Sequence, residues 1–142
     1  MAEESIRLVY DVDGSNFSSA GAASEAVKSK LKQLGVSSQD IRRVAIAMYE
    51  GEINMVIHAS GGQAIIDVFL DRIQIVLADH GKGIEDIALA MQPGYSTAPE
   101  DVRALGFGAG MGLPNMKKYT DEFNIESTVG IGTTVTMVIK FN

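Results

Sequence analysis

The stretch from residue 63 to residue 78 limits the fold more than any other part of the chain. Two β-rich runs, 63–70 and 73–78, are joined at Asp71 and Arg72, which predicts an antiparallel hairpin. The second run is apolar on both faces, so we expect it to be a central strand of the sheet. Its apolar residues are Ile73, Ile75, Val76, Leu77 and Ala78.

Polar–apolar periodicity predicts further elements on both sides of this hairpin. Residues 5–12 alternate as a strand does, and residues 123–128 and 133–141 form a closing hairpin. Four helices are expected. The first runs from a cap at Ser18 or Ser19 to about Leu34, and the second from a cap at Ser37 or Ser38 to about Ala59. Two shorter helices are expected over 84–91 and 113–121. The core stripe of the second helix is predicted to be Ile41, Val44, Ala45, Met48, Met55 and Val56.

These elements predict a single α+β domain over residues 1–142. The architecture is a two-layer α/β sandwich, with a mixed, mostly antiparallel sheet and helices on one face. A length of 142 residues with 46% hydrophobic residues is enough for one packed core.

Composition excludes several classes of function. The net charge of −6 argues against binding to a nucleic-acid backbone, which needs a basic face, but not against a nucleotide held by backbone N–H groups. With no cysteine, disulfides and thiolate chemistry are excluded. Because the acidic N-terminus has no apolar signal core and no apolar run could span a bilayer, we expect a cytoplasmic protein without membrane contact.

Four short segments carry glycines or carboxylates in an informative order: 50–54, 79–83, 106–112 and 130–134. Each segment alone is a weak signal. Together they predict a nucleotide pocket built by a helix, two loops at strand ends and a mobile glycine-rich lid.

Glu50, Asn54 and His58 are spaced four apart, so they share one face of the second helix. A carboxylate here could act as a general base, and an amide oxygen one turn away is a suitable magnesium ligand. The alternative is a solvated polar face, and for Glu52 we prefer that alternative.

Asp79 ends the predicted central strand and is followed by Gly81 and Gly83. A carboxylate at this place needs hydrogen-bond donors or a wet pocket, and the glycines let the backbone approach a flat ligand. A simple strand-to-helix turn capped by Asp79 is equally compatible with the pattern. Lys82 is not the lysine of a phosphate-binding loop, because the flanking pattern is absent.

Residues 106–112 carry a glycine at every second position, which suits neither a helix nor a strand. Backbone N–H groups of such a segment could surround phosphate oxygens, and Leu113 then begins a helix. The alternative is a flexible loop without a ligand. Residues 130–134 are predicted to be a hairpin turn whose threonine hydroxyls could reach a phosphate.

In this combination the chain resembles the GHKL (Bergerat-fold) ATPases from about Ser5 to its end. Within them it is most similar to the small anti-sigma-factor and stress-switch serine/threonine kinases of bacteria. The pattern Glu50-x-x-x-Asn54 resembles the first motif of that family, Asp79-x-Gly81-x-Gly83 its adenine-side motif, 106–112 its lid, and 130–134 its last motif. Residues 94–97 are also similar to these kinases, whereas 99–105 are not clearly shared.

The resemblance implies ATP or ADP and Mg²⁺ as ligands. Glu50 would be the base that activates a partner's hydroxyl, Asn54 would coordinate Mg²⁺, and Asp79 would accept a hydrogen bond from the adenine amino group. The other residues implied to contact nucleotide are Gly81, Gly83, Gly106, Gly108, Gly110, Met111, Gly112, Leu113 and Thr133.

The expected function is therefore that of a Mg-ATP-binding regulatory serine/threonine kinase that phosphorylates a small partner protein. A sigma factor or a phosphatase is a further expected partner, and a homodimer through the first helix or the sheet edge stays open. One alternative is a non-catalytic module whose partner binding is gated by nucleotide. Simple ATP hydrolysis is a weaker alternative, because nothing in the sequence couples hydrolysis to work.

Overall fold

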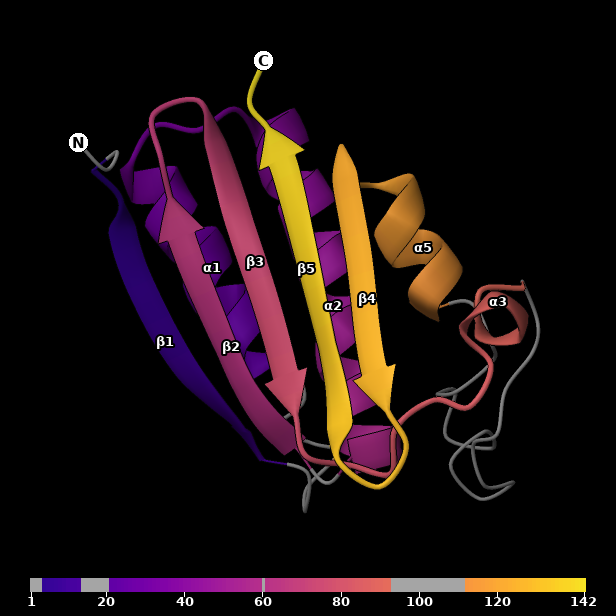
Figure 1. Ribbon diagram of the computed structural model, residues 1–142. Coiled ribbons are helices and arrows are strands. Elements are labelled where there is room, and N and C mark those ends of the chain that lie inside the picture. Colours follow the sequence, from indigo (N-terminus) through magenta and orange to yellow (C-terminus); the bar gives the residue numbers. More distant parts are fainter. Residues whose placement is uncertain (1–3, 14–20, 60, 93–111) are drawn as a thin grey trace.

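The computed structural model describes residues 4–13, 21–59, 61–92 and 112–142, which form two layers (Figure 1). One layer is a five-stranded sheet, and the long helices cover one of its faces. The elements are β1 (Ile6–Asp13), α1 (Ala22–Gln33), α2 (Ser38–Ala59), β2 (Gly61–Val68), β3 (Arg72–Asp79), α3 (Ile87–Ala90), α5 (Gly112–Lys118), β4 (Glu122–Thr128) and β5 (Gly132–Lys140). The predicted α+β sandwich is confirmed.

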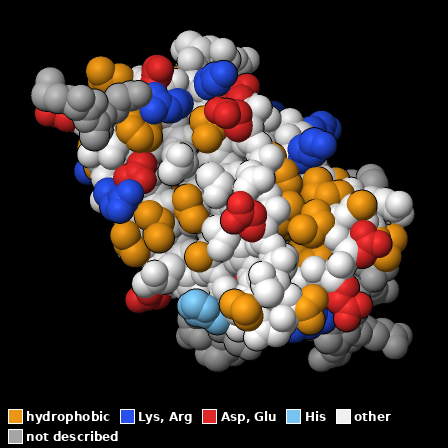
Figure 2. Space-filling view, in the orientation of Figure 1, with side chains coloured by type: hydrophobic (Ala, Val, Ile, Leu, Met, Phe, Trp, Pro, Cys, Tyr) orange, Lys and Arg blue, Asp and Glu red, His pale blue; other side chains and the backbone are white. Residues whose placement is uncertain are grey.

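The strands lie in the order β1-β2-β3-β5-β4, and all four neighbouring pairs are antiparallel. The prediction that β3 is central is confirmed. Ile73, Ile75 and Leu77 are buried beneath the helices, while Gln74 and Val76 lie half-buried on the other face. That open face mixes hydrophobic side chains with charges of both signs (Figure 2).

The helix layer buries the apolar stripe of α2 against the sheet and α1. Of the predicted stripe, only Ala45 is not buried; it is half-buried because it lines a groove between α1 and α2. The buried residues of the stripe are Ile41, Val44, Met48, Met55 and Val56. The side-chain pattern therefore predicted most of the inner face of α2, but it included the half-buried Ala45 and omitted the buried Ala47 and Ile53.

The start of α1 is held by a residue from another helix. Its N-cap, Gly21, has no side-chain cap, and the predicted caps Ser18 and Ser19 lie outside the described residues. Instead, the carboxylate of Glu52 on α2 accepts hydrogen bonds from the backbone N–H groups of Gly21, Ala23 and Ser24. Glu52 is only 2% exposed, so the expectation of a solvated side chain is wrong. The orphan N–H groups of a helix start explain why a carboxylate is buried there.

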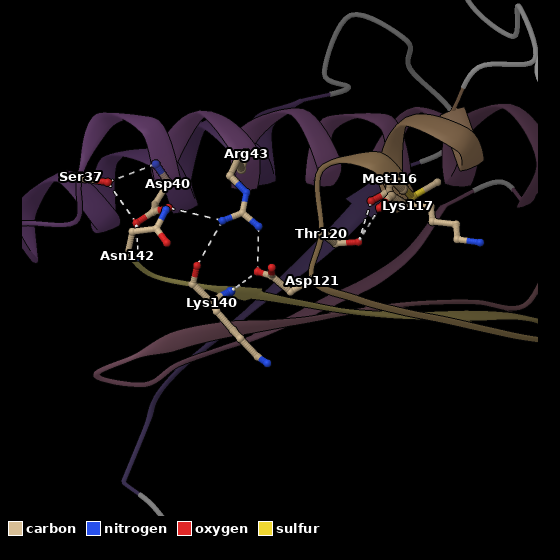
Figure 3. A network of polar contacts seen from close by, with 9 residues as sticks. All are labelled: Ser37, Asp40, Arg43, Met116, Lys117, Thr120, Asp121, Lys140 and Asn142. Carbon is tan, nitrogen blue, oxygen red and sulfur yellow. Dashed lines mark hydrogen bonds and ion pairs between the residues drawn. The ribbon is translucent and has the colours of Figure 1, made fainter.

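The start of α2 is joined to the end of the chain by a polar network (Figure 3). The buried carboxylate of Asp40 accepts a hydrogen bond from the backbone N–H of Asn142 at 3.0 Å. Arg43 donates to the carboxylate of Asp121 at 2.7 Å and to the carbonyl oxygen of Lys140 at 3.2 Å. This network fixes the N-terminal half of α2 over the last strand.

Candidate functional site

Three of the four predicted segments meet at one end of the molecule. The C-terminal half of α2, the end of β3 and the turn between β4 and β5 lie together at this end (Figure 1). The start of α5 packs against α2 beside them. Segments far apart in the sequence are thus brought into one region.

Asp79 connects two of these segments through one oxygen. Its Oδ1 accepts hydrogen bonds from the backbone N–H of Gly81 at 2.9 Å and of Thr133 at 3.0 Å. The half-buried carboxylate therefore both caps its own turn and binds the first residues of β5. Within the described part of the chain, Oδ2 makes no hydrogen bond, so it is available to a donor on a ligand.

Two glycines allow the loop after β3 to touch the β4–β5 turn. At Gly83, with φ of 79°, a Cβ atom would lie 2.5 Å from the carbonyl oxygen of Thr128. At Gly132, a Cβ atom would lie 2.1 Å from the carbonyl oxygen of Asp79. Both positions need glycine because the two backbones touch there. The sequence analysis had explained the glycines after β3 only by close approach to a flat ligand.

Ser127 joins the same two loops, and the sequence analysis missed it. Its hydroxyl accepts a hydrogen bond from the backbone N–H of Ile84 at 2.7 Å and lies 2.8 Å from the hydroxyl of Thr133. The backbone N–H of Gly130 also donates to the carbonyl oxygen of Lys82 at 2.9 Å. A polar residue at an inward position of β4, after Phe123 and Ile125, was the signal that could have identified Ser127.

Glu50 and Asn54 lie one turn apart on α2, both half-buried, and face the start of α5. The side-chain amide of Asn115 donates to Oε1 of Glu50 at 3.4 Å. A Cβ atom on Gly112 would lie 3.1 Å from Oδ1 of Asn54, so the backbone of α5 passes directly beside this amide. The structure therefore places Asn54 beside Gly112, and Glu50 beside Asn115 of the same helix.

Leu113 is buried, with an exposed fraction of 9%, so its side chain belongs to the core and only its backbone could contact a ligand. Gly106, Gly108, Gly110 and Met111 lie outside the described residues. Within the described ranges, no cluster of three histidine, aspartate or glutamate side chains could hold a metal ion. No helix of these ranges is both long and apolar enough to cross a lipid bilayer.

Comparison with known proteins identifies the fold and its family. The model of the histidine kinase-like ATPase domain matches residues 15–139. The chain belongs to the histidine kinase-like ATPase family. This family is the one that the four motifs indicated.

The related curated proteins are small bacterial regulators. The chain is 34% identical to the serine/threonine-protein kinase RsbT of Bacillus subtilis over 118 residues, which are 80% of this chain and 83% of RsbT. It is 39% identical to the anti-sigma F factor of Caldanaerobacter subterraneus over 110 residues, which are 74% of this chain and 73% of that protein. The predicted similarity to anti-sigma-factor and switch kinases is confirmed.

Solved structures support the same fold at lower identity. The RsbU and RsbW domains of a Mycobacterium tuberculosis protein match with a TM-score of 0.65 and 17% identity, over 96% of this chain and 32% of that one. The mycobacterial sensor histidine kinase MprB matches with a TM-score of 0.53 and 14% identity, over 96% of this chain and 99% of that one. At these identities the likeness concerns the fold alone.

Proposed function

We propose that this protein binds Mg-ATP and transfers the γ-phosphoryl group to a serine or threonine hydroxyl of a partner protein. The observation that carries the proposal is the pair Glu50 and Asn54, a carboxylate and an amide one turn apart and facing the start of α5. Its relative RsbT, which is named as a serine/threonine-protein kinase, supports the same reaction.

The adenine end of the nucleotide is assigned to Asp79. Two backbone N–H groups bind Oδ1 and hold the carboxylate in place, which leaves Oδ2 for the amino group of the base. A carboxylate that is positioned in advance loses little conformational freedom when the ligand binds. Gly81, Gly83 and Thr133 belong to the two loops that surround this carboxylate.

Asn54 is the residue assigned to Mg²⁺. Its neutral amide oxygen suits a hard cation that takes most of its ligands from phosphates and water. When bound, Mg²⁺ neutralises part of the negative charge that develops on the phosphates. The lid glycines Gly106, Gly108, Gly110 and Gly112 are assigned, with Met111, to the phosphates.

Glu50 is assigned as the general base. Its carboxylate accepts the proton of the partner's hydroxyl while that oxygen forms a bond to the γ-phosphorus. The bond from the γ-phosphorus to the bridging oxygen breaks, and its electron pair leaves with ADP. The hydrogen bond from Asn115 is long, so it orients the carboxylate without occupying it fully.

The partner we expect is a small regulatory phospho-acceptor protein, with a sigma factor or a phosphatase as a further partner. We place the protein in the cytoplasm, where ATP and such partners occur. A homodimer remains a prediction, which sedimentation equilibrium of the purified protein would test.

Calorimetric titration of Mg-ADP and Mg-ATP tests the nucleotide site. We expect binding to the wild type and to Asp71→Ala, whose exposed aspartate lies at the opposite end of β3, but none to Asp79→Ala. If the wild type binds neither nucleotide, the proposal fails at its first step.

Transfer of labelled γ-phosphate to proteins extracted from the source organism, with identification of the phosphorylated residue, tests the reaction. Replacing Glu50 by Gln should preserve nucleotide affinity and slow transfer about 100- to 10,000-fold. The exposed Glu25→Gln serves as the matched control. Binding without transfer by the wild type would instead support a nucleotide-gated, non-catalytic module.

A further inference from the structure

A solvent-open groove of about 410 Å³ runs between α1 and α2, away from the residues assigned to the nucleotide. The groove lies between the C-terminal half of α1 and the N-terminal half of α2. Apolar side chains and three cations line it. The lining residues are Lys28, Lys32, Val36, Ser38, Ile41, Arg42, Ala45 and Ile46.

The apolar part of this lining is accessible. Val36, Ala45 and Ile46 are half-buried, and Ile41 lies beneath them with an exposed fraction of 6%. One turn further along α2, Tyr49 is 41% exposed and extends the apolar strip towards Gly21. A strip of this kind between two helices offers contacts to apolar side chains that repeat along one face of a third helix.

The three cations of the groove have no acidic partner in the described part of the chain. Lys32 and Arg42 are exposed and Lys28 is half-buried, and none of them forms an ion pair or a side-chain hydrogen bond there. The three other described arginines do form ion pairs: Arg7 with Asp67, Arg43 with Asp121, and Arg72 with Asp71.

This contrast matters because the protein has a net charge of −6. Acidic residues outnumber basic ones, 18 to 12, yet no carboxylate in the described ranges pairs with the cations around the groove. Unpaired positive charges beside an apolar strip attract a ligand that has negative charges beside its own apolar strip.

The groove is separate from the nucleotide site along α2. Arg42 precedes Glu50 by eight residues, which corresponds to about 12 Å along a helix. Ile46, at the other end of the lining, precedes Glu50 by four residues, or about 6 Å, and neither Glu50 nor Asn54 lines the groove.

We propose that this groove docks an acidic amphipathic helix of a partner protein. Apolar residues of that helix, spaced three and four apart, lie on Ala45 and Ile46, and its flanking Asp or Glu side chains pair with Lys28, Lys32 and Arg42. The groove is a docking surface distinct from the phosphorylation site, so it binds a partner whether or not Glu50 acts as a base.

A display library of helical peptides, each about 15 residues long, tests this proposal. The apolar positions vary among Leu, Ile, Met and Phe, and the flanking positions vary among Glu, Gln and Lys. On the wild type we expect enrichment of Glu at the flanks. On the double variant Lys32→Glu/Arg42→Glu we expect enrichment of Lys instead, because the charges of the groove are reversed.

Affinities of the selected peptides complete the test. A peptide with Glu flanks should bind the double variant at least about tenfold more weakly than the wild type, which corresponds to about 1.4 kcal/mol. The control variant Lys30→Glu/Lys117→Glu has the same net charge as the double variant but leaves the groove lining unchanged. It should bind the peptide with Glu flanks as tightly as the wild type does. Mg-ADP affinity should be equal in all three proteins, so failure here is distinguishable from failure of the nucleotide site.

Two results would overturn the proposal. One is the absence of any enriched helical pattern, or enrichment of the same flanks on both proteins. The other is binding to vesicles of phosphatidylglycerol and phosphatidylcholine that disappears in the double variant while no peptide is enriched. That result would assign the groove to an anionic lipid surface.

Discussion

Replacing Glu52 by Gln should destabilise the protein strongly, because the carboxylate of Glu52 supplies the N-terminal cap of α1. Its Oε2 accepts hydrogen bonds from the backbone N–H of Gly21 at 3.0 Å and of Ala23 at 3.3 Å, while Oε1 binds the N–H of Ser24. Glutamine keeps the size of the side chain and one acceptor oxygen. Its NH₂ group, however, would face a backbone N–H group, and the negative charge at the helix start would be lost.

The magnitude follows from these contacts. A buried donor left without a partner costs about 1–3 kcal/mol, and a charge at a partly buried helix end contributes up to about 2 kcal/mol. We therefore expect Glu52→Gln to lower the free energy of unfolding by about 2–4 kcal/mol. With a urea m-value of about 2 kcal/mol per molar, the unfolding midpoint should fall by about 1–2 M.

Equilibrium unfolding in urea, followed by circular dichroism, measures this shift. The control is Glu25→Gln, which removes an exposed carboxylate from the first turn of the same helix and should cost no more than about 1 kcal/mol. If both variants shift the midpoint equally, the three hydrogen bonds to Glu52 do not stabilise the fold.

Three further predictions follow from the packing and charges. In the same urea assay, Gly51→Ala should lower the free energy of unfolding by about 1–3 kcal/mol, because its Cβ would lie 2.0 Å from Cδ1 of Leu77. An unchanged unfolding midpoint would contradict the close contact of α2 and β3. Gly132→Ala should weaken Mg-ADP binding in calorimetry, since its Cβ would displace the carbonyl of Asp79. Unchanged affinity for Mg-ADP would mean that the β4–β5 turn is not part of the nucleotide site. A hydrogen bond from Arg7 lowers the pKa of Asp67 below its ordinary value of 3.8, and the backbone N–H of Lys140 lowers the pKa of Asp121. Both carboxylates therefore stabilise the fold fully above about pH 4 and lose this contribution as the pH falls through their lowered pKa values. On acidification, the urea unfolding midpoint of Asp67→Asn should therefore fall less than that of the wild type.

The elements of the fold could be predicted because their signals are local. The apolar run Ile73–Ala78 identified the central strand, and the spacing of Ile41, Val44 and Met48 identified the inner face of α2. Boundaries were less accurate: the predicted helix over 84–91 is formed only from Ile87 to Ala90. The end of a short helix depends on contacts that the local pattern does not contain.

The candidate site could be predicted only as a set of segments. Asp79 was found because it ends an apolar strand, but its hydrogen bond to Thr133 joins residues 54 positions apart. Ser127 was missed for the same reason, since its bond to the N–H of Ile84 exists only after β4 and the loop have come together. Such contacts depend on how the strands are ordered, and the sequence pattern of one strand carries no such information.

Glu50 and Glu52 illustrate this limit most clearly. Two residues apart on a helix, they point about 200° away from each other, so the periodicity of α2 requires different surroundings for the two carboxylates. It does not say which surroundings each one has. The surroundings depend on where the starts of α1 and α5 pack. In the structure, the start of α1 packs against Glu52 and the start of α5 packs against Glu50. A buried carboxylate was therefore mistaken for a solvated one because the donors that bind it, Gly21 and Ser24, belong to another helix.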